Sequence, residues 1–150
     1  SFPTTAGGGG NELDAYVSYD FGPLALTVTN YTFPDGDGTY SSGGFFDGDL
    51  EISASTEIGG LSLMGGYFPD LETLYIEAGF GLGDVDFAIG FGSDSADAFY
   101  VGAGESAICN VSFGYSKEIK ITDDYSLPLF SSFIFNPKSE AAFMVFGASF

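Results

Sequence analysis

The chain has 150 residues, of which 21 are Asp or Glu, against three cationic side chains and no His, giving a formal net charge of −18. This balance argues against nucleic-acid binding, because neutralising phosphates requires clustered Lys and Arg. The lack of His, together with a lone Cys109, excludes Ser-His-Asp and Cys-His triads, zinc sites of the usual nitrogen and sulfur type, and an internal disulfide.

Glycine and aromatic residues are abundant, with 23 Gly, 17 Phe and 9 Tyr, whereas strong helix formers are scarce. The chain is 45% hydrophobic, so its acidity does not indicate disorder. No run of about 18 apolar residues occurs, so neither a transmembrane helix nor a signal peptide is predicted within these residues. The composition predicts a single all-β domain over residues 1–150.

Alternation of apolar and polar residues with period two predicts nine strands. In chain order they span 13–21, 24–33, 50–58, 61–68, 73–82, 85–92, 107–121, 125–136 and 141–150. Four connections are tight turns at one end of the strands, at 22–23, 59–60, 83–84 and 122–124. The other end carries the longer loops at 34–49 and 93–106 and the shorter ones near 69–72 and 137–140.

Most strands sort into an apolar face and a face of small, polar and acidic residues. In chain order, the acids on the polar faces are Asp14, Asp20, Glu51, Glu57, Glu77, Asp86 and Glu118. The apolar faces include Leu74, Ile76, Phe87, Ile89, Val111, Phe113, Phe133 and Phe146. Cys109 also falls on an apolar face, and Lys117 is the only charged residue well inside one.

Two architectures use such strands. A soluble sandwich buries its apolar faces between two sheets, and its loop lengths need not alternate by end. An outer-membrane barrel turns its apolar face to lipid, lines its lumen with small and polar residues, and has short turns at one end and longer loops at the other. The sequence favours the second, an antiparallel up-and-down transmembrane β-barrel with the seven acids in its lumen. Aromatic residues near strand ends, such as Tyr31, Phe68 and Tyr115, are expected in interfacial girdles.

Residues 117–150, which contain KEIKITD, SLP and NPKSE, resemble the C-terminal hairpins of a family of outer-membrane barrel proteins from Bacteroidota related to the TorF-like porins. DAYVSYDFGPLALTVTNYTFPDG at 14–36 and LYIEAGFGLGDVDFAIGFG at 74–92 are similar to the same family. The resemblance implies an outer-membrane barrel with at most a porin role and no catalytic residues. The sequence departs from the family at its start, where a signal peptide and the first strands would be expected.

Two features at the ends of the chain bear on the barrel. The last strand closes on Phe150, a C-terminal residue common in bacterial outer-membrane barrels and expected to act as a membrane-insertion signal. Bacterial single-chain barrels usually have an even number of strands with both termini in the periplasm. Because nine strands are visible, ten or twelve are expected in the native protein, with one or three preceding Ser1.

Acidic residues could indicate calcium binding or acid–base catalysis, and the sequence favours neither. Segment 34–49 holds four acids, but their spacing does not match the EF-hand pattern. We expect a solvated extracellular loop where divalent cations could bind, with Phe45 and Phe46 dipping into a partner or folding over the mouth. The lumen carboxylates have no accompanying nucleophile or metal motif, so neither an enzyme nor a cofactor or metal site is predicted.

The sequence is compatible with three functions. The first is a bacterial outer-membrane barrel that acts as a narrow pore with an acidic, cation-preferring lumen. The second is a non-conducting barrel that serves as a structural or binding subunit of a larger outer-membrane complex, in contact with membrane lipid and other outer-membrane proteins. The third is a secreted acidic β-sandwich with an adhesive role.

Overall fold

The computed structural model describes residues 13–32, 48–96, 98–123 and 125–148, which form nine β-strands and no helix. The strands are β1 (Leu13–Asp20), β2 (Leu24–Thr32), β3 (Asp49–Ile58), β4 (Leu61–Phe68), β5 (Thr73–Leu82), β6 (Val85–Ser93), β7 (Ser106–Lys120), β8 (Ser126–Asn136) and β9 (Ala141–Ala148). The predicted all-β class and the nine predicted strands are confirmed, with boundaries shifted by one or two residues at several ends.

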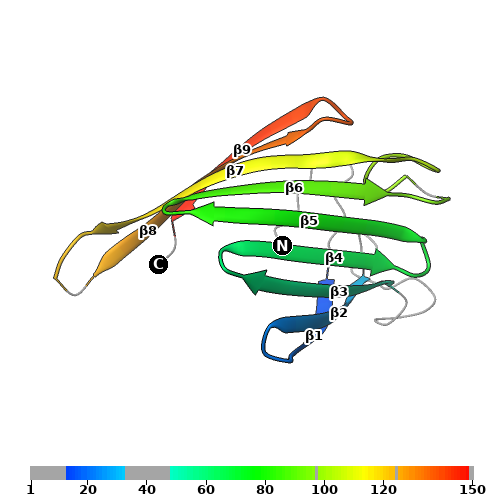
Figure 1. The fold of residues 1–150 in the computed structure, drawn as a ribbon, viewed down its shortest axis with the longest axis horizontal. Helices are drawn as coiled ribbons and strands as arrows, with labels where there is room; N and C mark the ends of the chain where they lie inside the picture. The colour runs from blue at the N-terminus through cyan, green and yellow to red at the C-terminus, as the bar shows by residue number, and fades with distance from the viewer. Residues whose placement is uncertain (1–12, 33–47, 97, 124, 149–150) are drawn as a thin grey trace, which may run out of the picture.

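The described strands form one sheet in which each strand pairs antiparallel with the next in sequence (Figure 1). A sandwich needs two facing sheets, and these residues form only one. The sheet is not closed, so β1 and β9 are its two edges. None of the described residues belongs to a helix long and apolar enough to cross a membrane.

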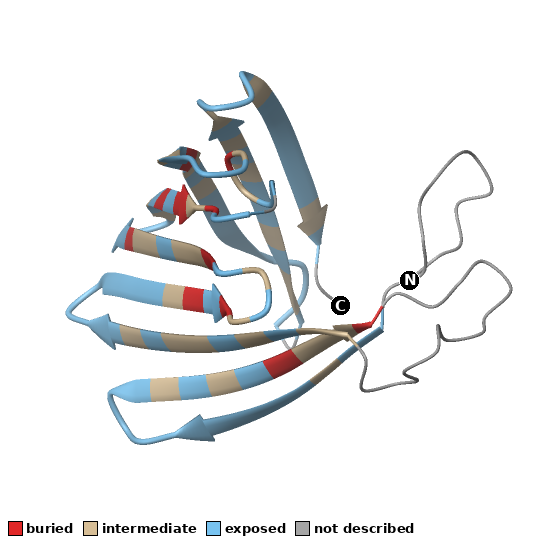
Figure 2. Ribbon diagram, turned by 90° about the vertical axis from the view of Figure 1, so that its right-hand side faces the viewer, coloured by how far each residue is buried: buried red, intermediate tan, exposed pale blue. Residues whose placement is uncertain are grey.

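The sheet is strongly curved, and its two edges do not meet (Figure 2). Crowding identifies the concave face. A Cβ built on Gly79 would lie 2.4 Å from Ser62 Oγ, whereas one built on Gly65, which faces the other way, would have its nearest neighbour at 3.8 Å. Side chains converge on the inner face of a curled sheet, so the face of Gly79 and Ser62 is the concave one.

Successive hairpins are staggered in one direction. Leu61, at the β3–β4 turn, pairs with Phe80, and β5 then continues for two more residues. Val85, at the β5–β6 turn, pairs with Tyr115, and β7 then continues to Lys120. The β7–β8 hairpin therefore projects beyond the rest of the sheet (Figure 1). A stagger of constant sign is the shear that tilted strands acquire in a barrel wall.

One β-bulge corrects the sequence interpretation of Cys109. Gly90 pairs with Asn110 and Phe91 pairs with Ile108, so β7 has one extra residue between the two pairs. The extra residue shifts the alternation, and the Cys109 Sγ lies 3.2 Å from a Cβ built on concave-facing Gly92. The thiol is buried on the concave side, with 7% of the residue exposed, and does not face outward as predicted.

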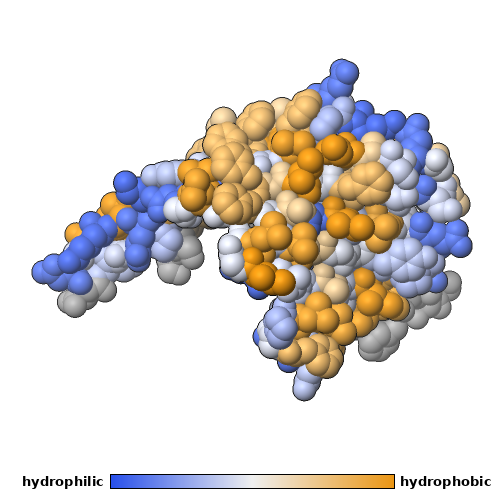
Figure 3. All heavy atoms as spheres, viewed as in Figure 1, coloured by the Kyte–Doolittle hydropathy of each residue, from blue (hydrophilic) through white to orange (hydrophobic). Residues whose placement is uncertain are grey.

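The described residues contain almost no conventional apolar core. Their only buried apolar residues are Phe68, Val101 and Cys109, all near the long-loop end. Most of the large apolar side chains lie on the convex face, and the space-filling view shows them gathered across the middle of the sheet, with hydrophilic residues at its ends (Figure 3). The fold thus exposes the surface that a soluble protein would bury.

Candidate functional site

The strand register places all seven predicted lumen acids on the concave face. Glu77 pairs with Gly90 and Asp86 with Gly114. The remaining five occupy equivalent positions: Asp14 opposite Tyr31, Asp20 opposite Ala25, Glu51 opposite Thr29, Glu57 opposite Ser62, and Glu118 opposite Pro128. These acids are spread over five strands, and only some of them meet other polar side chains.

Glu51 is the first acid held by a tyrosine. The Tyr31 hydroxyl on β2 donates a hydrogen bond of 3.0 Å to Glu51 Oε2 on β3. Gly66 on β4 leaves room for this carboxylate, because a Cβ there would lie 2.7 Å from Glu51 Oε1. Tyr31 therefore belongs to the concave face and not to an interfacial girdle, and the same holds for Phe68, which is 3% exposed.

Glu77 is the second acid held in this way. The Tyr75 hydroxyl donates to Glu77 Oε2, and the Asn110 amide donates to both groups, at 2.8 Å to Glu77 Oε2 and 3.2 Å to Tyr75 Oη. Asn110 Oδ1 is buried without a hydrogen-bond partner among the described residues. Gly90 makes this arrangement possible, since a Cβ there would lie 2.1 Å from Tyr75 Oη.

The loop between β6 and β7 is organised by one buried carboxylate. Asp94 is 4% exposed, and its Oδ2 accepts four backbone N–H bonds of 2.8–3.0 Å. The donors are Phe99, Tyr100, Val101 and Gly102. Such convergence folds the loop around the carboxylate at a fixed position.

Electrostatics agree with this geometry. Burial alone would raise the pKa of the Asp94 carboxyl, but the four backbone N–H groups outweigh burial and hold its pKa below the ordinary value of 3.8. Burial, followed by the nearby Glu51 carboxylate, raises the pKa of the Tyr100 phenol, so this side chain stays neutral at physiological pH. The loop therefore presents one fixed anion and one neutral phenol.

Aromatic contacts hold the loop between β6 and β7 against the concave face. The Phe99 ring lies 5.0 Å from Phe68, and the Tyr100 ring lies 5.0 Å from Tyr75. Val101, at 8% exposed, is the third apolar anchor. We call residues 94–105 the inner loop. Its contacts to Phe68 and Tyr75 place it directly over the two tyrosine–carboxylate pairs.

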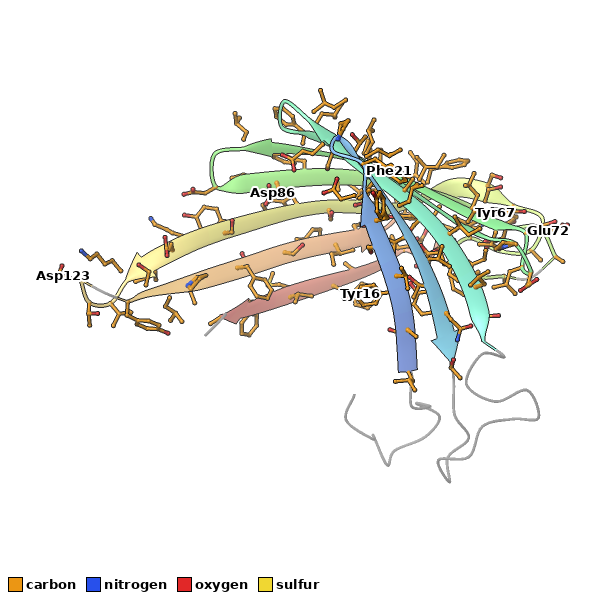
Figure 4. All side chains as sticks on the ribbon, turned by 90° about the horizontal axis from the view of Figure 1, so that it is seen from below. Tyr16, Phe21, Tyr67, Glu72, Asp86 and Asp123 are labelled. Carbon is orange, nitrogen blue, oxygen red and sulfur yellow. The ribbon has the colours of Figure 1, made fainter. Side chains whose placement is uncertain are left out.

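The neighbouring turns hold the inner loop from both sides. On one side Ser95 donates a hydrogen bond of 3.0 Å to Glu72 in the β4–β5 turn. On the other, Glu105 forms an ion pair with Lys138 in the β8–β9 turn. Glu72 and Asp123 mark opposite ends of the molecule (Figure 4), so these contacts all gather at the long-loop end.

The other predicted lumen acids make fewer side-chain contacts than Glu51 and Glu77. Asp20 accepts a hydrogen bond of 2.6 Å from the backbone of Gly22 in its own turn. Asp86 borders a concave hollow of about 370 Å³ that Gly79, Gly81 and Gly114 also line. None of the described residues forms a group of three or more acids, Cys or His able to hold a metal ion.

The inner face is not polar throughout. On β8 and β9 it carries Phe130, Ile134, Phe143 and Val145, which pair with Ser116, Ser112, Ile134 and Ser132 respectively. The sequence interpretation had given this part of the sheet a polar inner face. Here both faces are largely apolar, so the acidic lining is concentrated on β1–β7.

The predicted lipid-facing residues all occupy the convex face. A row of directly paired residues crosses six strands in the order Leu61, Phe80, Phe87, Phe113, Phe133 and Met144, each between 39% and 73% exposed. Ile76, Ile89, Val111 and Phe146 are exposed on the same face. Phe150 and nearly all of segment 34–49, including Phe45 and Phe46, lie outside the described residues.

Three residues of this site escaped the sequence interpretation, namely Asp94, Tyr100 and Asn110. A signal existed for Tyr100, because the run Phe99–Val101 is apolar within a loop of mostly small and acidic residues. Asn110 sits beside the bulge, and only the partner strand reveals its role.

The fold and site define a curved, open, antiparallel β-sheet with an acidic concave face, an apolar convex face and a loop folded onto the concave side. The chain matches no family model, no curated protein and no solved structure.

Proposed function

We propose that this chain forms the wall of a transmembrane β-barrel of the outer-membrane type, and that the barrel is a narrow, cation-preferring pore. The observation that carries the proposal is the separation of the two faces: every predicted lumen acid is concave and every predicted lipid-facing residue is convex. This is the inside-polar, outside-apolar alternation of membrane barrels.

Energetics favour lipid over water as the medium for the convex face. A large apolar side chain gains about 1.5–3 kcal/mol when it leaves water entirely. The row from Leu61 to Met144 leaves six such residues at least 39% exposed. Soluble monomers rarely expose contiguous apolar patches larger than a few hundred Å², so a hydrocarbon environment accounts for this surface.

The concave face favours a pore with a charge preference. Carboxylates in a narrow lumen attract cations and repel anions, and all seven predicted lumen acids lie on the concave face. The inner loop adds Asp94 and narrows the space in front of Tyr31 and Tyr75. A folded loop at the mouth of a barrel limits the size of what passes.

Closure of the barrel requires further strands. β1 and β9 run parallel, because neighbouring strands alternate in direction and both have odd numbers. Joining these two edges through antiparallel pairs takes an odd number of strands between them, which gives ten or twelve in all. A barrel of the Bacteroidota family related to the TorF-like porins, located in the bacterial outer membrane, fits this architecture.

The open edges also favour a second candidate function. Unpaired edge strands present free backbone N–H and C=O groups that invite pairing with another chain. A non-conducting barrel subunit that completes its wall with strands of other outer-membrane proteins would use these edges. This candidate needs neither the acidic lining nor the inner loop, so we place it second.

Planar-bilayer recording of the folded protein separates the two candidates. The pore predicts single-channel steps, with a reversal potential in a KCl gradient that reports cation preference. Glu51→Gln combined with Glu77→Gln should lower that preference, whereas Glu140→Gln, which removes a charge from an exposed turn, should lower it less. Protein that shows heat-modifiable mobility but no channel steps would reject the pore in favour of the second candidate.

A further inference from the structure

The three lysines of the chain differ in their surroundings. Lys120 pairs with Asp123 at 2.8 Å, and Lys138 pairs with Glu105. Lys117 forms no ion pair and no side-chain hydrogen bond with any described residue, although the chain contains 21 acids. Its partner in the register is Leu129, which places it on the apolar convex face. The ammonium is therefore available to an anion from outside the chain.

Lys117 lines a groove of about 610 Å³ on the projecting part of the sheet. Apolar side chains make up most of its walls: Ile119 on β7, Leu129 on β8, and Phe146 and Ala148 on β9. Phe146 is 80% exposed, the highest value among the exposed large apolar residues. The groove therefore offers a long apolar surface with a single cation in it.

Two hydroxyl groups lie on the same face as the ammonium. Tyr115 pairs directly with Ser131, one step along the face from the pair of Lys117 and Leu129. Neither side-chain hydroxyl makes a hydrogen bond with another described residue. An ammonium and two free hydroxyls beside one another can donate to a single phosphate group.

We propose that this groove binds one glycerophospholipid, with its phosphate on Lys117 and an acyl chain along Ile119, Leu129 and Phe146. The site rests on the proposed function, since it needs the convex face to meet a bilayer. The position of the groove supports phosphate binding. Lys117 lies close to the β7–β8 turn, and the ends of transmembrane strands reach the membrane interface, where the lipid phosphate groups are found.

Native mass spectrometry of the folded protein in neutral detergent tests the site. The probe is phosphatidylglycerol. Diacylglycerol serves as an arm with chains and no phosphate, and inorganic phosphate as an arm with no chains. We expect one retained phosphatidylglycerol per chain and little retention in either control arm. Lys117→Met should weaken retention roughly five- to tenfold, whereas Lys117→Arg should preserve it.

Lys120→Met is the matched control, because it removes the same charge from the tip of the same hairpin and should leave retention unchanged. Equal retention by Lys117→Met and the wild type overturns the site, as does equal binding of diacylglycerol. Competition of inorganic phosphate with the lipid would reduce the site to a phosphate site, which also overturns the proposal. Heat-modifiable mobility reports folding separately: a folded protein that retains no phosphatidylglycerol rejects only the lipid site, whereas a protein that does not fold in detergent rejects the barrel itself.

Discussion

At the scale of single residues, Asp94 does most to shape the site. Its carboxylate oxygen gathers four N–H groups that would otherwise need water. Charge-assisted hydrogen bonds of this kind are stronger than neutral ones. Because a folded pKa below the ordinary value means that the ionised form is stabilised, Asp94 contributes stability at neutral pH.

The inner loop should therefore loosen in acid. Its stabilisation is complete above the ordinary pKa of 3.8 and is lost as the pH falls below that value through the folded pKa. We expect the amide proton shifts of residues 99–102 in micelles to titrate together, with a midpoint below 3.8. Asp94→Asn should abolish this titration, and Asp84→Asn, in the turn at the opposite end, should not. Unchanged titration in Asp94→Asn would assign the transition to another group.

A neighbouring pair of residues tests which face meets lipid. Val111 is convex and 40% exposed, and Ser112 is concave and borders the hollow beside Asp86. Val111→Lys should cost about 2–4 kcal/mol of unfolding free energy near the bilayer midplane. Ser112→Lys should cost less, because its ammonium can reach water and the Asp86 carboxylate. Urea titration in phosphatidylcholine vesicles, followed by Tyr fluorescence, measures both. Equal costs would mean that the faces are assigned wrongly.

At the scale of strands, glycine positions decide where polar side chains can lie. Gly90→Ala would put a Cβ 2.1 Å from Tyr75 Oη and 2.9 Å from Asn110 Cβ. Tyr75 would have to move and would lose its bonds to Glu77 and Asn110, at a cost of about 1–3 kcal/mol. Gly65→Ala is the control, because it faces outward with no heavy atom nearer than 3.8 Å. The same urea titrations compare the two variants. A Gly90→Ala protein as stable as Gly65→Ala would show that the tyrosine cluster is not tightly held.

The strands were predictable from the sequence because their signal is local. Each segment shows alternation with period two, and this alternation assigned the acids and the apolar row to opposite faces of the sheet, as the strand register does. Cys109 was misplaced because a bulge adds one residue to a strand without leaving a mark in the pattern. Tyr31 and Phe68 were misplaced because proximity to a strand end does not reveal which face a residue occupies.

The inner loop was not predictable for a different reason. Its conformation depends on contacts with residues distant in sequence, such as Phe68 and Tyr75. No periodic pattern records such contacts. The concave cluster of Tyr75, Glu77 and Asn110 likewise depends on strand pairing, since Asn110 lies 33 positions from Glu77.

At the scale of the whole molecule, the inner loop and the wall together set the behaviour of the pore. Releasing the loop should widen the mouth, because Phe99 and Tyr100 would leave the concave face. We therefore expect Asp94→Asn to raise single-channel conductance in planar bilayers, with Asp84→Asn as the control. A conductance equal to that of the wild type would place the narrowest point elsewhere along the wall.

The glycines of the concave face have a consequence for permeation. In barrels of about eight strands, inward side chains already fill the interior, and larger pores gain their opening by adding strands. Here the hollow of about 370 Å³ lies over Gly79, Gly81 and Gly114, where no side chain projects inward. The opening in this wall is thus made by omitting side chains. Its sieving limit could be reset by one methyl group at Gly114, where a Cβ would have no neighbour nearer than 3.7 Å, with the outer surface and the number of strands untouched.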